Sequence, residues 1–328
     1  MITDTQREER KSYIGGSDIG AILGLSKYDT KVSVYQAKVE GVTKDLSDNE
    51  AVHFGNVLED VIAAEFARRL NVRVARVNDT VKHRKHGWAA ANIDRRIMGL
   101  IDGQRAGLEC KNAGHFMAEE FGEIGSDEVP DYYLAQCCWY MEVLGYDVWY
   151  LAVLIGGNEF RWYKIKRDQQ LIDHMLLVAE KLWNENVLAK VAPAPVNQGD
   201  VERRWPRSNG NVIVATEEIA TAVAKLRELK AKIKELTGNE KSPEQGDNIE
   251  WLELQVKTFL GANDSILVSE GGDALVTYST VDAMKFSQSA LKDSMPDVYE
   301  SFKRPSSYRK FDVKKPKKSN QGKLKLVA

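Results

Sequence analysis

The stretch ANIDRRIMGLIDGQRAGLECKNAG, residues 91–114, contains the pattern on which the interpretation of this chain depends. It holds Asp94 and, fifteen residues later, the run Glu109-Cys110-Lys111. Because side chains alternate along a strand, Glu109 and Lys111 are expected to share the exposed face of a sheet, with Cys110 on the other face. If Asp94 ends an adjacent strand, its carboxylate and that of Glu109 can bracket a hard cation such as magnesium. Lys111 can then hold or polarise the attacking water.

The same pattern has an ordinary explanation, because Asp…Glu-x-Lys is common and equally describes an ion pair on the surface of a strand. Glu59 favours the metal site. It lies on the side of a predicted helix that also carries Ala63 and Phe66, so we expect it to be half buried. A buried carboxylate without a partner is costly, and either a metal or an ion pair with an arginine would remove that cost.

Two polar residues of a second predicted helix, YYLAQCCWYMEVLG (132–145), stand four positions apart. They are Gln136 and Tyr140, and residues at this spacing share one face of a helix. From there they can orient a phosphate or a water above the sheet. Alternatively, they are polar residues at the edge of a packed helix.

The surrounding pattern predicts a mixed α/β fold. Apolar residues recur at helical spacing over 50–70, whereas 71–77 alternates in the manner of a strand. VWYLAVLIGG (148–157) predicts a buried strand, and FRWYKIKR (160–167) predicts its hairpin partner. Near the amino terminus, IGGSDIGAILGLS (14–26) predicts a glycine turn and a helix that Ser17 or Asp18 can cap.

A proline-containing segment, APAPVNQGD, predicts a domain boundary near residue 200. We expect a core over 1–200, a mainly helical accessory module over 201–302 and a basic tail over 303–328. The module is predicted to contain two long helices, 217–238 and 249–261, and a short hairpin at 265–279.

The formal net charge of −2 hides the basic character of the tail, which carries ten Lys or Arg against the single acid Asp312. Such a tail suggests a polyanionic partner, although a solvated tail that only improves solubility fits equally well.

Composition excludes several classes of protein. No apolar run approaches the roughly 20 residues that cross a bilayer, so we expect a soluble, intracellular protein with no membrane partner. Three cysteines cannot supply the four thiolates of a usual iron–sulfur cluster or structural zinc site. The chain lacks the G-x-x-x-x-G-K-[ST] signature of ATP hydrolysis.

Five motifs in this order resemble YqaJ-like viral recombinases, a family grouped with phage lambda exonuclease in the PD-(D/E)XK nuclease superfamily. The resemblance covers roughly residues 10–190. The motifs are IGGSDIGAILGLSKYDT (14–30), GNVLED (55–60), ANIDRR…GLECKNA (91–113), PDYYLAQCCWYMEVLG (130–145) and LAVLIGGNEFRWYKIKRD (151–168).

The resemblance implies a PD-(D/E)XK restriction-endonuclease-like core, in which a central mixed sheet is flanked by helices. It implies a 5′-to-3′ double-strand DNA exonuclease of phage recombination that uses two magnesium ions, for which manganese can substitute. It further implies that the enzyme acts on double-stranded DNA ends, works with a single-strand annealing protein and forms a homo-oligomer, as a trimeric ring around the duplex.

Carried over by position, the resemblance assigns Asp94 and Glu109 as metal-binding carboxylates and the backbone carbonyl of Cys110 as a further ligand. Lys111 corresponds to the catalytic lysine. Glu59 matches the helix glutamate that helps to hold the second metal.

The resemblance also assigns residues that bind the substrate. Gln136 and Tyr140 match the family's glutamine and tyrosine positions. Arg10 and Ser17, seven residues apart, resemble the pair that grips the 5′-terminal phosphate, with Lys11 as an alternative to Arg10.

This sequence departs from the commoner Pro-Asp-Gly form of the motif, since it has Ile93-Asp94-Arg95. Asp102 is therefore a rival for the metal-binding aspartate, but it precedes Gly103 in a predicted turn, so Asp94 is preferred. Candidate contacts to the DNA backbone are basic residues, which could equally form a solvated turn, namely KHRKH (82–86), Arg95 and Arg96.

Two alternative functions remain compatible with the sequence. A structure-specific or restriction-type endonuclease would use the same core without the 5′-phosphate pocket. A DNA-binding or assembly protein would have lost activity, whereas this chain retains Glu59, Asp94, Glu109 and Lys111.

Overall fold

The computed structural model describes two compact units, Met1–Ala194 and Pro195–Ala328. The predicted boundary lay slightly later, near residue 200. Within these units, the described residues are 8–44, 46, 48–237, 246–261, 264–285 and 304–313.

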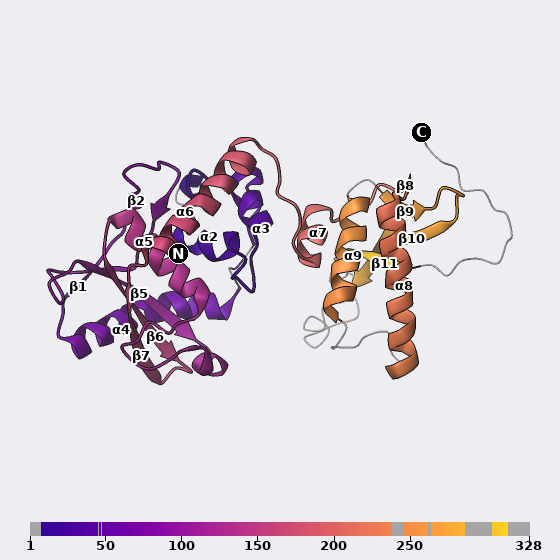
Figure 1. Ribbon diagram of the computed structural model, residues 1–328. Coiled ribbons are helices and arrows are strands. Elements are labelled where there is room, and N and C mark those ends of the chain that lie inside the picture. Colours follow the sequence, from indigo (N-terminus) through magenta and orange to yellow (C-terminus); the bar gives the residue numbers. More distant parts are fainter. Residues whose placement is uncertain are drawn as a thin grey trace, which may run out of the picture. The chain divides into compact units, whose positions relative to one another are not determined.

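A five-stranded sheet in the order β1-β4-β5-β6-β7 forms the centre of the first unit (Figure 1). β5 and β6 run parallel, and the other neighbours run antiparallel, so the sheet is mixed. The predicted α/β class is therefore confirmed. The strands are β1 (Val74–Arg76), β4 (Arg95–Ile97), β5 (Ala106–Ala113), β6 (Val148–Ile155) and β7 (Glu159–Lys166), while β2 (Val81–Lys82) and β3 (Ala90–Ala91) form a separate pair.

The helix α4 (Glu50–Leu70) covers one face of this sheet. The side chain of Asn49 caps its first turn, and Asn71 ends it in the left-handed conformation. Ile62 and Phe66 are buried against the α4 side of β5 and β6. The helix predicted over 50–70 is thus confirmed, and its apolar stripe faces the sheet as expected.

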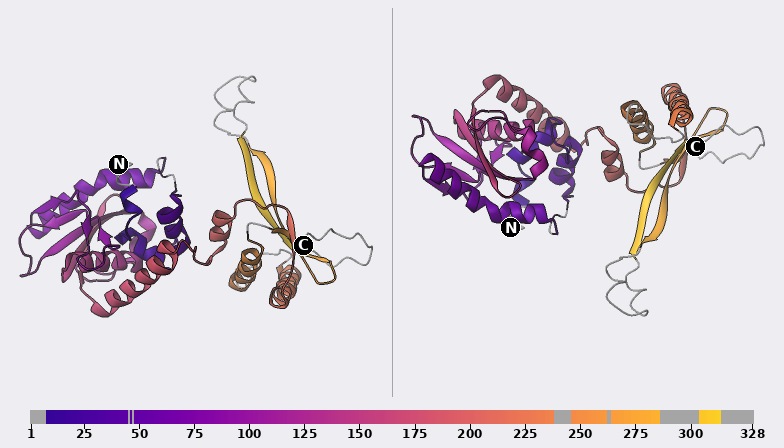
Figure 2. Two further views of the ribbon diagram at one scale, coloured as in Figure 1. Left: turned by 90° about the horizontal axis from the view of Figure 1, so that it is seen from above. Right: turned by 90° about the horizontal axis from the view of Figure 1, so that it is seen from below.

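The helices α2 (Gly16–Ile22), α5 (Asp131–Leu144) and α6 (Gln169–Leu182) share one hydrophobic core on the opposite face (Figure 2). Gly145 ends α5 in the left-handed conformation, which residues other than glycine rarely adopt. Successive residues of β6 contribute to the two cores in turn. Burial on both faces explains why the sequence of β6 is a continuous apolar run.

The turn before α2 differs in detail from the prediction. Gly15 occupies the cap position, and the carboxylate of Asp18 accepts a hydrogen bond from the Gly15 N–H at 2.8 Å. Ser17 is exposed and is not the cap.

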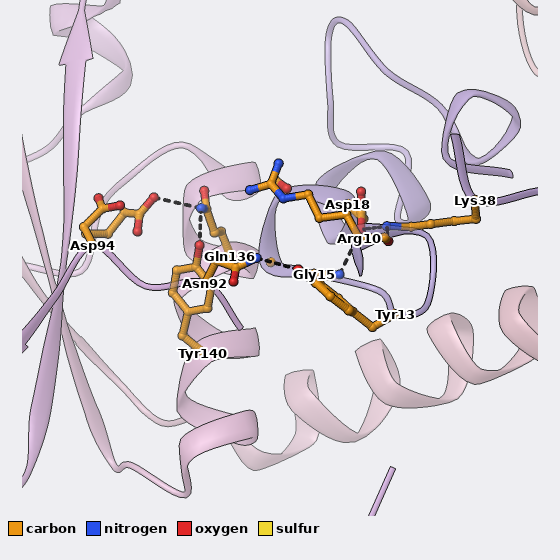
Figure 3. A pocket seen from close by; sticks show the side chains of 12 residues that line it. Arg10, Tyr13, Gly15, Asp18, Lys38, Asn92, Asp94, Gln136 and Tyr140 are labelled. Carbon is orange, nitrogen blue, oxygen red and sulfur yellow. Dashed lines mark hydrogen bonds and ion pairs between the residues drawn. The ribbon is translucent and has the colours of Figure 1, made fainter. Parts of the chain in front are cut away.

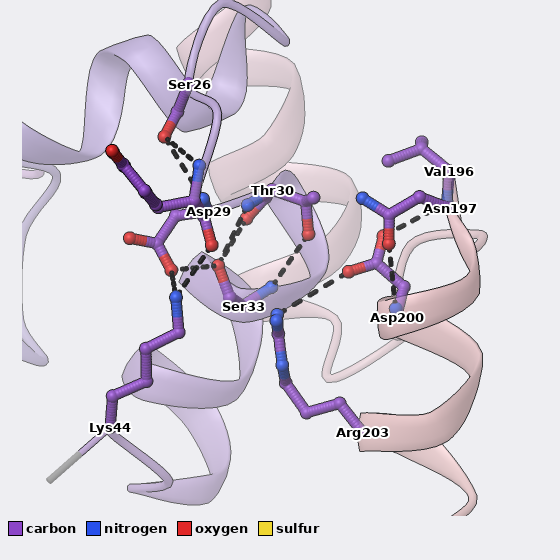
Figure 4. A network of polar contacts seen from close by, with 10 residues as sticks. Ser26, Asp29, Thr30, Ser33, Lys44, Val196, Asn197, Asp200 and Arg203 are labelled. Carbon is purple, nitrogen blue, oxygen red and sulfur yellow. Dashed lines mark hydrogen bonds and ion pairs between the residues drawn. The ribbon is translucent and has the colours of Figure 1, made fainter.

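A network of polar contacts caps the N-terminal end of α3 (Lys31–Tyr35), as Figure 4 shows. The hydroxyl of Thr30 accepts from the Ser33 N–H at 3.3 Å, and Ser33 Oγ accepts from the Thr30 N–H at 3.0 Å. Asp29 accepts from Lys44 Nζ at 2.8 Å. These contacts fix the segment from which the next turn, Gln36–Glu40, presents Lys38.

The second unit combines helices with a four-stranded sheet in the order β11-β10-β9-β8. Both predicted long helices are present, and β9 with β10 is the predicted hairpin. The structure adds β8, and it adds β11 from the segment predicted as a basic tail. The elements are α7 (Gln198–Arg204), β8 (Asn211–Val214), α8 (Glu217–Thr237), α9 (Gly246–Leu260), β9 (Asp264–Val268), β10 (Ala274–Lys285) and β11 (Arg304–Val313).

The core of this unit contains Val223, Leu226, Val256 and Tyr278. The predicted tail beyond β11 lies outside the described residues. In the described part of the chain, no helix is both long enough and apolar enough to cross a membrane.

Candidate active site

The strand β5 presents Glu109 and Lys111 toward α5, and strand alternation predicted that they would share a face. Glu109 Oε1 accepts hydrogen bonds from Lys111 Nζ at 2.6 Å and from Gln136 Nε2 at 2.8 Å. The face is not exposed, contrary to the prediction, because α5 covers it. Glu109 is only 3% exposed.

The second carboxylate oxygen of Glu109, Oε2, is buried and has no hydrogen-bond partner among the described residues. A buried charged oxygen without a partner is strongly unfavourable in free energy. A further positively charged group can therefore bind at Glu109 Oε2.

Asp94 lies at the open edge of β5. Its Oδ2 accepts a hydrogen bond from the Cys110 N–H at 2.8 Å. The edge is open there because β4 pairs with β5 only through Arg95 and Arg96, opposite Leu108 and Gly107. Within a strand, the N–H and C=O of one residue point to the same side. The carbonyl of Cys110 therefore points to the edge where Asp94 lies.

Glu109 is close enough to Asp94 for its charge to influence the protonation of Asp94. Burial and the nearby charge of Glu109 hold the pKa of Asp94 well above its usual range. Burial opposes the charge of Lys111, but the carboxylates of Glu109 and Asp94 overcome it and raise the pKa of the ammonium. Burial thus favours the uncharged form of Asp94, and a further positive group beside it would favour the carboxylate.

Gln136 and Tyr140 lie on one face of α5, as their spacing predicted. Gln136 Nε2 donates to Glu109 Oε1 and also to Tyr140 Oη, at 2.7 Å. Tyr140 in turn touches α2: a Cβ atom added to Gly16 would lie 2.5 Å from its ring. This close approach requires glycine at the start of α2.

A cavity of about 210 Å³ opens in front of these side chains (Figure 3). Its wall combines residues predicted to bind the substrate with residues predicted to hold a metal ion. Of the predicted site residues, the cavity is lined by Arg10, Ser17, Asp94, Glu109, Gln136 and Tyr140.

Arg10 and its alternative Lys11 have different surroundings. The side chain of Arg10 extends along the cavity toward Gln136 (Figure 3). Lys11 Nζ instead pairs with Glu8 at 2.6 Å, and Lys11 is not part of the cavity wall. The geometry favours Arg10.

The sequence analysis missed Lys38, whose side chain is 5% exposed and also lines the cavity. Its Nζ lies 2.7 Å from Asp18 Oδ2 and donates to the backbone carbonyl of Arg10 at 2.8 Å. No local pattern marks this lysine, because its partners lie far from it along the chain.

Two further wall residues, Tyr13 and Asn92, were also missed. Asn92 Nδ2 donates to Tyr13 Oη at 2.7 Å. Asn92 stands two residues before Asp94, and this proximity is the available sequence signal for it.

Glu59 is half buried, as predicted, but it does not line the cavity. Its Oε1 lies 2.6 Å from Arg95 Nη1 and 3.3 Å from Arg76 Nη2. The alternative explanation, an ion pair with an arginine, describes this arrangement. Within the described residues, no three His, Cys, Asp or Glu side chains gather closely enough to hold a metal.

Arg95 was expected to contact the DNA backbone, and this prediction is wrong. The residue is only 4% exposed, because it packs under α4 and pairs with Glu59 and Asp60. Arg96 is exposed, as are Lys82, Arg84 and Lys85 of the basic run.

His83 of the same run is not free for DNA, since its ring nitrogen lies 3.2 Å from Glu142. The rival aspartate Asp102 occupies an exposed turn and pairs with Lys164, and it does not line the cavity.

The first unit thus combines a mixed α/β fold with a cavity lined by the neighbouring carboxylates of Asp94 and Glu109. Residues 7–147 match the model of the YqaJ-like viral recombinase domain. The protein YqaJ of Bacillus subtilis (strain 168) is 32% identical over 321 residues, which cover 96% of this chain and 95% of that protein. The chain therefore belongs to the YqaJ-like viral recombinase domain family, which supports a nuclease of the phage recombination type.

Two similar solved structures are described as exonucleases. The alkaline exonuclease LHK-Exo from Laribacter hongkongensis is 15% identical, with 58% of this chain and 94% of that chain covered and a TM-score of 0.46. The phage related exonuclease from Haemophilus somnus 129PT is 14% identical, with 54% and 96% covered and a TM-score of 0.41.

Proposed function

We propose that this chain is a magnesium-dependent exonuclease that degrades one strand of double-stranded DNA from its 5′ end. It releases 5′-mononucleotides and leaves a 3′ single-stranded overhang. One observation supports this proposal most directly: a single cavity joins Arg10 and Ser17 to Asp94 and Glu109. Groups suited to a terminal phosphate thus lie beside groups suited to hydrolysis of the next phosphodiester bond.

The residues present fit a hard divalent cation. Asp94 and Glu109 would hold it, together with the carbonyl of Cys110. The buried, partnerless Oε2 of Glu109 carries negative charge that a cation would neutralise, and a cation beside Asp94 would offset the burial that raises its pKa. When bound, magnesium or manganese supplies an activated water and stabilises charge on the leaving oxygen.

The protein's own groups perform the remaining tasks. Lys111 stays protonated beside Glu109, so it can stabilise negative charge developing on the attacked phosphate. Gln136 holds Glu109 and Tyr140 in place through its amide. The guanidinium of Arg10 and the hydroxyl of Ser17 would bind the 5′-terminal phosphate and so fix the distance to the cleaved bond.

The proposal also includes an annealing protein as partner and the assembly of several copies of the chain. Family membership supports a role in phage recombination within a bacterial cytoplasm, where the overhang would be passed to a single-strand annealing protein. We also propose a homo-oligomer that encloses the duplex as a trimeric ring. Sedimentation of the full chain with and without DNA tests the assembly.

The decisive experiment compares three DNA substrates with magnesium: linear duplex with 5′-phosphate ends, the same duplex with 5′-hydroxyl ends, and closed circles. We expect rapid loss of the 5′-phosphorylated duplex, slower loss of the 5′-hydroxyl duplex and intact circles. EDTA should abolish digestion, which shows dependence on a metal, and the variant Lys111→Ala should also abolish it, which excludes a contaminating nuclease.

Other outcomes would favour the alternatives. Cleaved circles would indicate an endonuclease of the structure-specific or restriction type. Binding of DNA without cleavage of any substrate, with either magnesium or manganese, would indicate a DNA-binding or assembly protein.

A further inference from the structure

Arg95 directly follows Asp94, yet the proposed reaction makes no use of it. It is the first residue of β4 and lies opposite Leu108 of β5. Residues directly opposite in an antiparallel pair share a face of the sheet, and Leu108 packs in the α4 core with Ile62. Arg95 therefore belongs to the α4 face, whereas Glu109 belongs to the α5 face.

On the α4 face, the guanidinium of Arg95 binds one carboxylate oxygen of Glu59. Its Nη1 donates to Glu59 Oε1 at 2.6 Å and to the carbonyl oxygen of Asp94 at 2.7 Å, and its Nη2 pairs with Asp60. The Arg95 side chain is 5% exposed. A guanidinium cannot lose its proton, so in this buried position it requires a carboxylate partner.

These contacts disfavour a metal ion on Glu59. If Glu59 turned to ligate a cation, the buried guanidinium of Arg95 would lose one of its two carboxylate partners and keep only Asp60, which is 70% exposed. The new cation would also lie beside two guanidinium groups, because Arg76 is already within 3.3 Å of the same Glu59 oxygen. Glu109 differs, because its Oε2 is buried without a partner among the described residues and only Lys111 pairs with its other oxygen.

The sequence departs from the family motif at this position, where Arg95 follows Asp94 in place of the glycine of Pro-Asp-Gly. We propose that the guanidinium of Arg95 replaces the second metal ion, so that this chain binds one divalent cation, held by Asp94 and Glu109. The inference rests on the proposed function, whose expected site holds two ions. It assigns Arg95 as the residue that sets the number of ions.

The test counts bound Mn²⁺ by equilibrium dialysis of the full chain, with the free ion measured by electron paramagnetic resonance. We expect one ion for the unmodified protein and two for Arg95→Gly, which frees Glu59. The double variant Arg95→Gly with Glu59→Gln should return to one ion. Arg96→Gly is the matched control, because it removes the neighbouring exposed arginine, and it should bind one ion. Circular dichroism of each variant verifies folding.

A second arm does not depend on the folding of Arg95→Gly. If Arg95 holds Glu59, the single variant Glu59→Gln binds one ion, like the unmodified protein. Two ions in the unmodified protein that fall to one in Glu59→Gln would overturn the inference and leave the proposed function intact. A folded Arg95→Gly that still binds one ion would also overturn it. No bound ion in the unmodified protein would overturn both.

Discussion

Each face of the central sheet carries a buried or half-buried glutamate, and the two glutamates differ in their charged neighbours. On the α5 face, Glu109 has one oxygen bound by Lys111 and Gln136 and one without a partner. On the α4 face, Glu59 is bound by arginine side chains. The comparison teaches that burial alone does not identify a metal-binding carboxylate, because a glutamate that is already paired with two arginines has little to gain from a cation.

The largest effect on activity is expected from the substitution Glu109→Gln on the α5 face. The change keeps the shape of the side chain but removes the charge that balances Lys111 and would hold the cation. We expect the rate of digestion of 5′-phosphorylated duplex to fall by roughly a thousandfold, the scale of losing one group that stabilises the transition state. Release of acid-soluble nucleotides measures the rate.

The control for this prediction is Glu65→Gln, on the exposed side of α4, where Glu65 pairs with Arg68 and Arg69. It should keep the unmodified rate. A folded Glu109→Gln protein with near-normal activity would show that the carboxylate of Glu109 takes no part in catalysis.

Breaking the α4 face should reduce stability. Arg95→Met leaves Glu59 half buried without its closest partner, and we expect a loss of about 2–3 kcal/mol in the free energy of unfolding. This loss of stability lies at the lower end of the range for a buried ion pair, because Asp60, the second carboxylate partner of Arg95, is 70% exposed. Urea unfolding followed by circular dichroism measures it. Arg68→Met, which removes an exposed arginine of α4, should hardly move the midpoint, and an equal effect of the two variants would contradict the proposed importance of burial.

The third prediction sharpens the description of the α5 side by separating recognition of the 5′ end from hydrolysis. Arg10→Gln removes a guanidinium that extends along the cavity. We expect the preference in kcat/KM for 5′-phosphate over 5′-hydroxyl ends to fall by roughly 30-fold, which corresponds to about 2 kcal/mol for a charge-assisted hydrogen bond. Lys11→Gln is the matched control and should retain the preference, because Lys11 pairs with Glu8. The opposite result would move the phosphate contact from Arg10 to Lys11.

A smaller effect is expected at Lys38, which acts through Arg10. Lys38→Met removes the contacts to the Arg10 carbonyl and to Asp18, so the same preference should fall by about fivefold, or close to 1 kcal/mol. Lys44→Met is a suitable control, since Lys44 forms a more exposed pair with Asp29. An unchanged preference in a folded Lys38→Met protein would exclude this positioning role.

Much of the fold could be predicted because its elements carry their own periodicity. The helix α4 shows an apolar stripe, and the hairpin of β6 and β7 shows two apolar strands around Gly156 and Gly157. The placement of Glu109 and Lys111 on one face followed from strand alternation alone. The missed strands β8 and β11 complete their sheet through pairings with distant segments, which a local pattern does not reveal.

The candidate site was predictable where a motif marks its residues and unpredictable where contacts between distant residues decide their role. In the sequence Arg95 resembles a free basic residue, whereas in the fold it pairs with Glu59 of α4. Lys38 carries no motif and becomes part of the cavity through the packing of α3 and the following turn near α2. Charge in a sequence does not reveal which charges neutralise each other after folding.

The hydrogen-sized side chain of Gly16 limits how this protein can vary over evolutionary time. A larger residue would push the ring of Tyr140, which is held by Gln136, and Gln136 in turn holds Glu109. A mutation at the first residue of α2 would thus affect the position of Glu109 through the side chains of Tyr140 and Gln136. Homologues that replace this glycine should therefore carry a compensating smaller residue at the position of Tyr140, so that the two positions would be inherited as a pair.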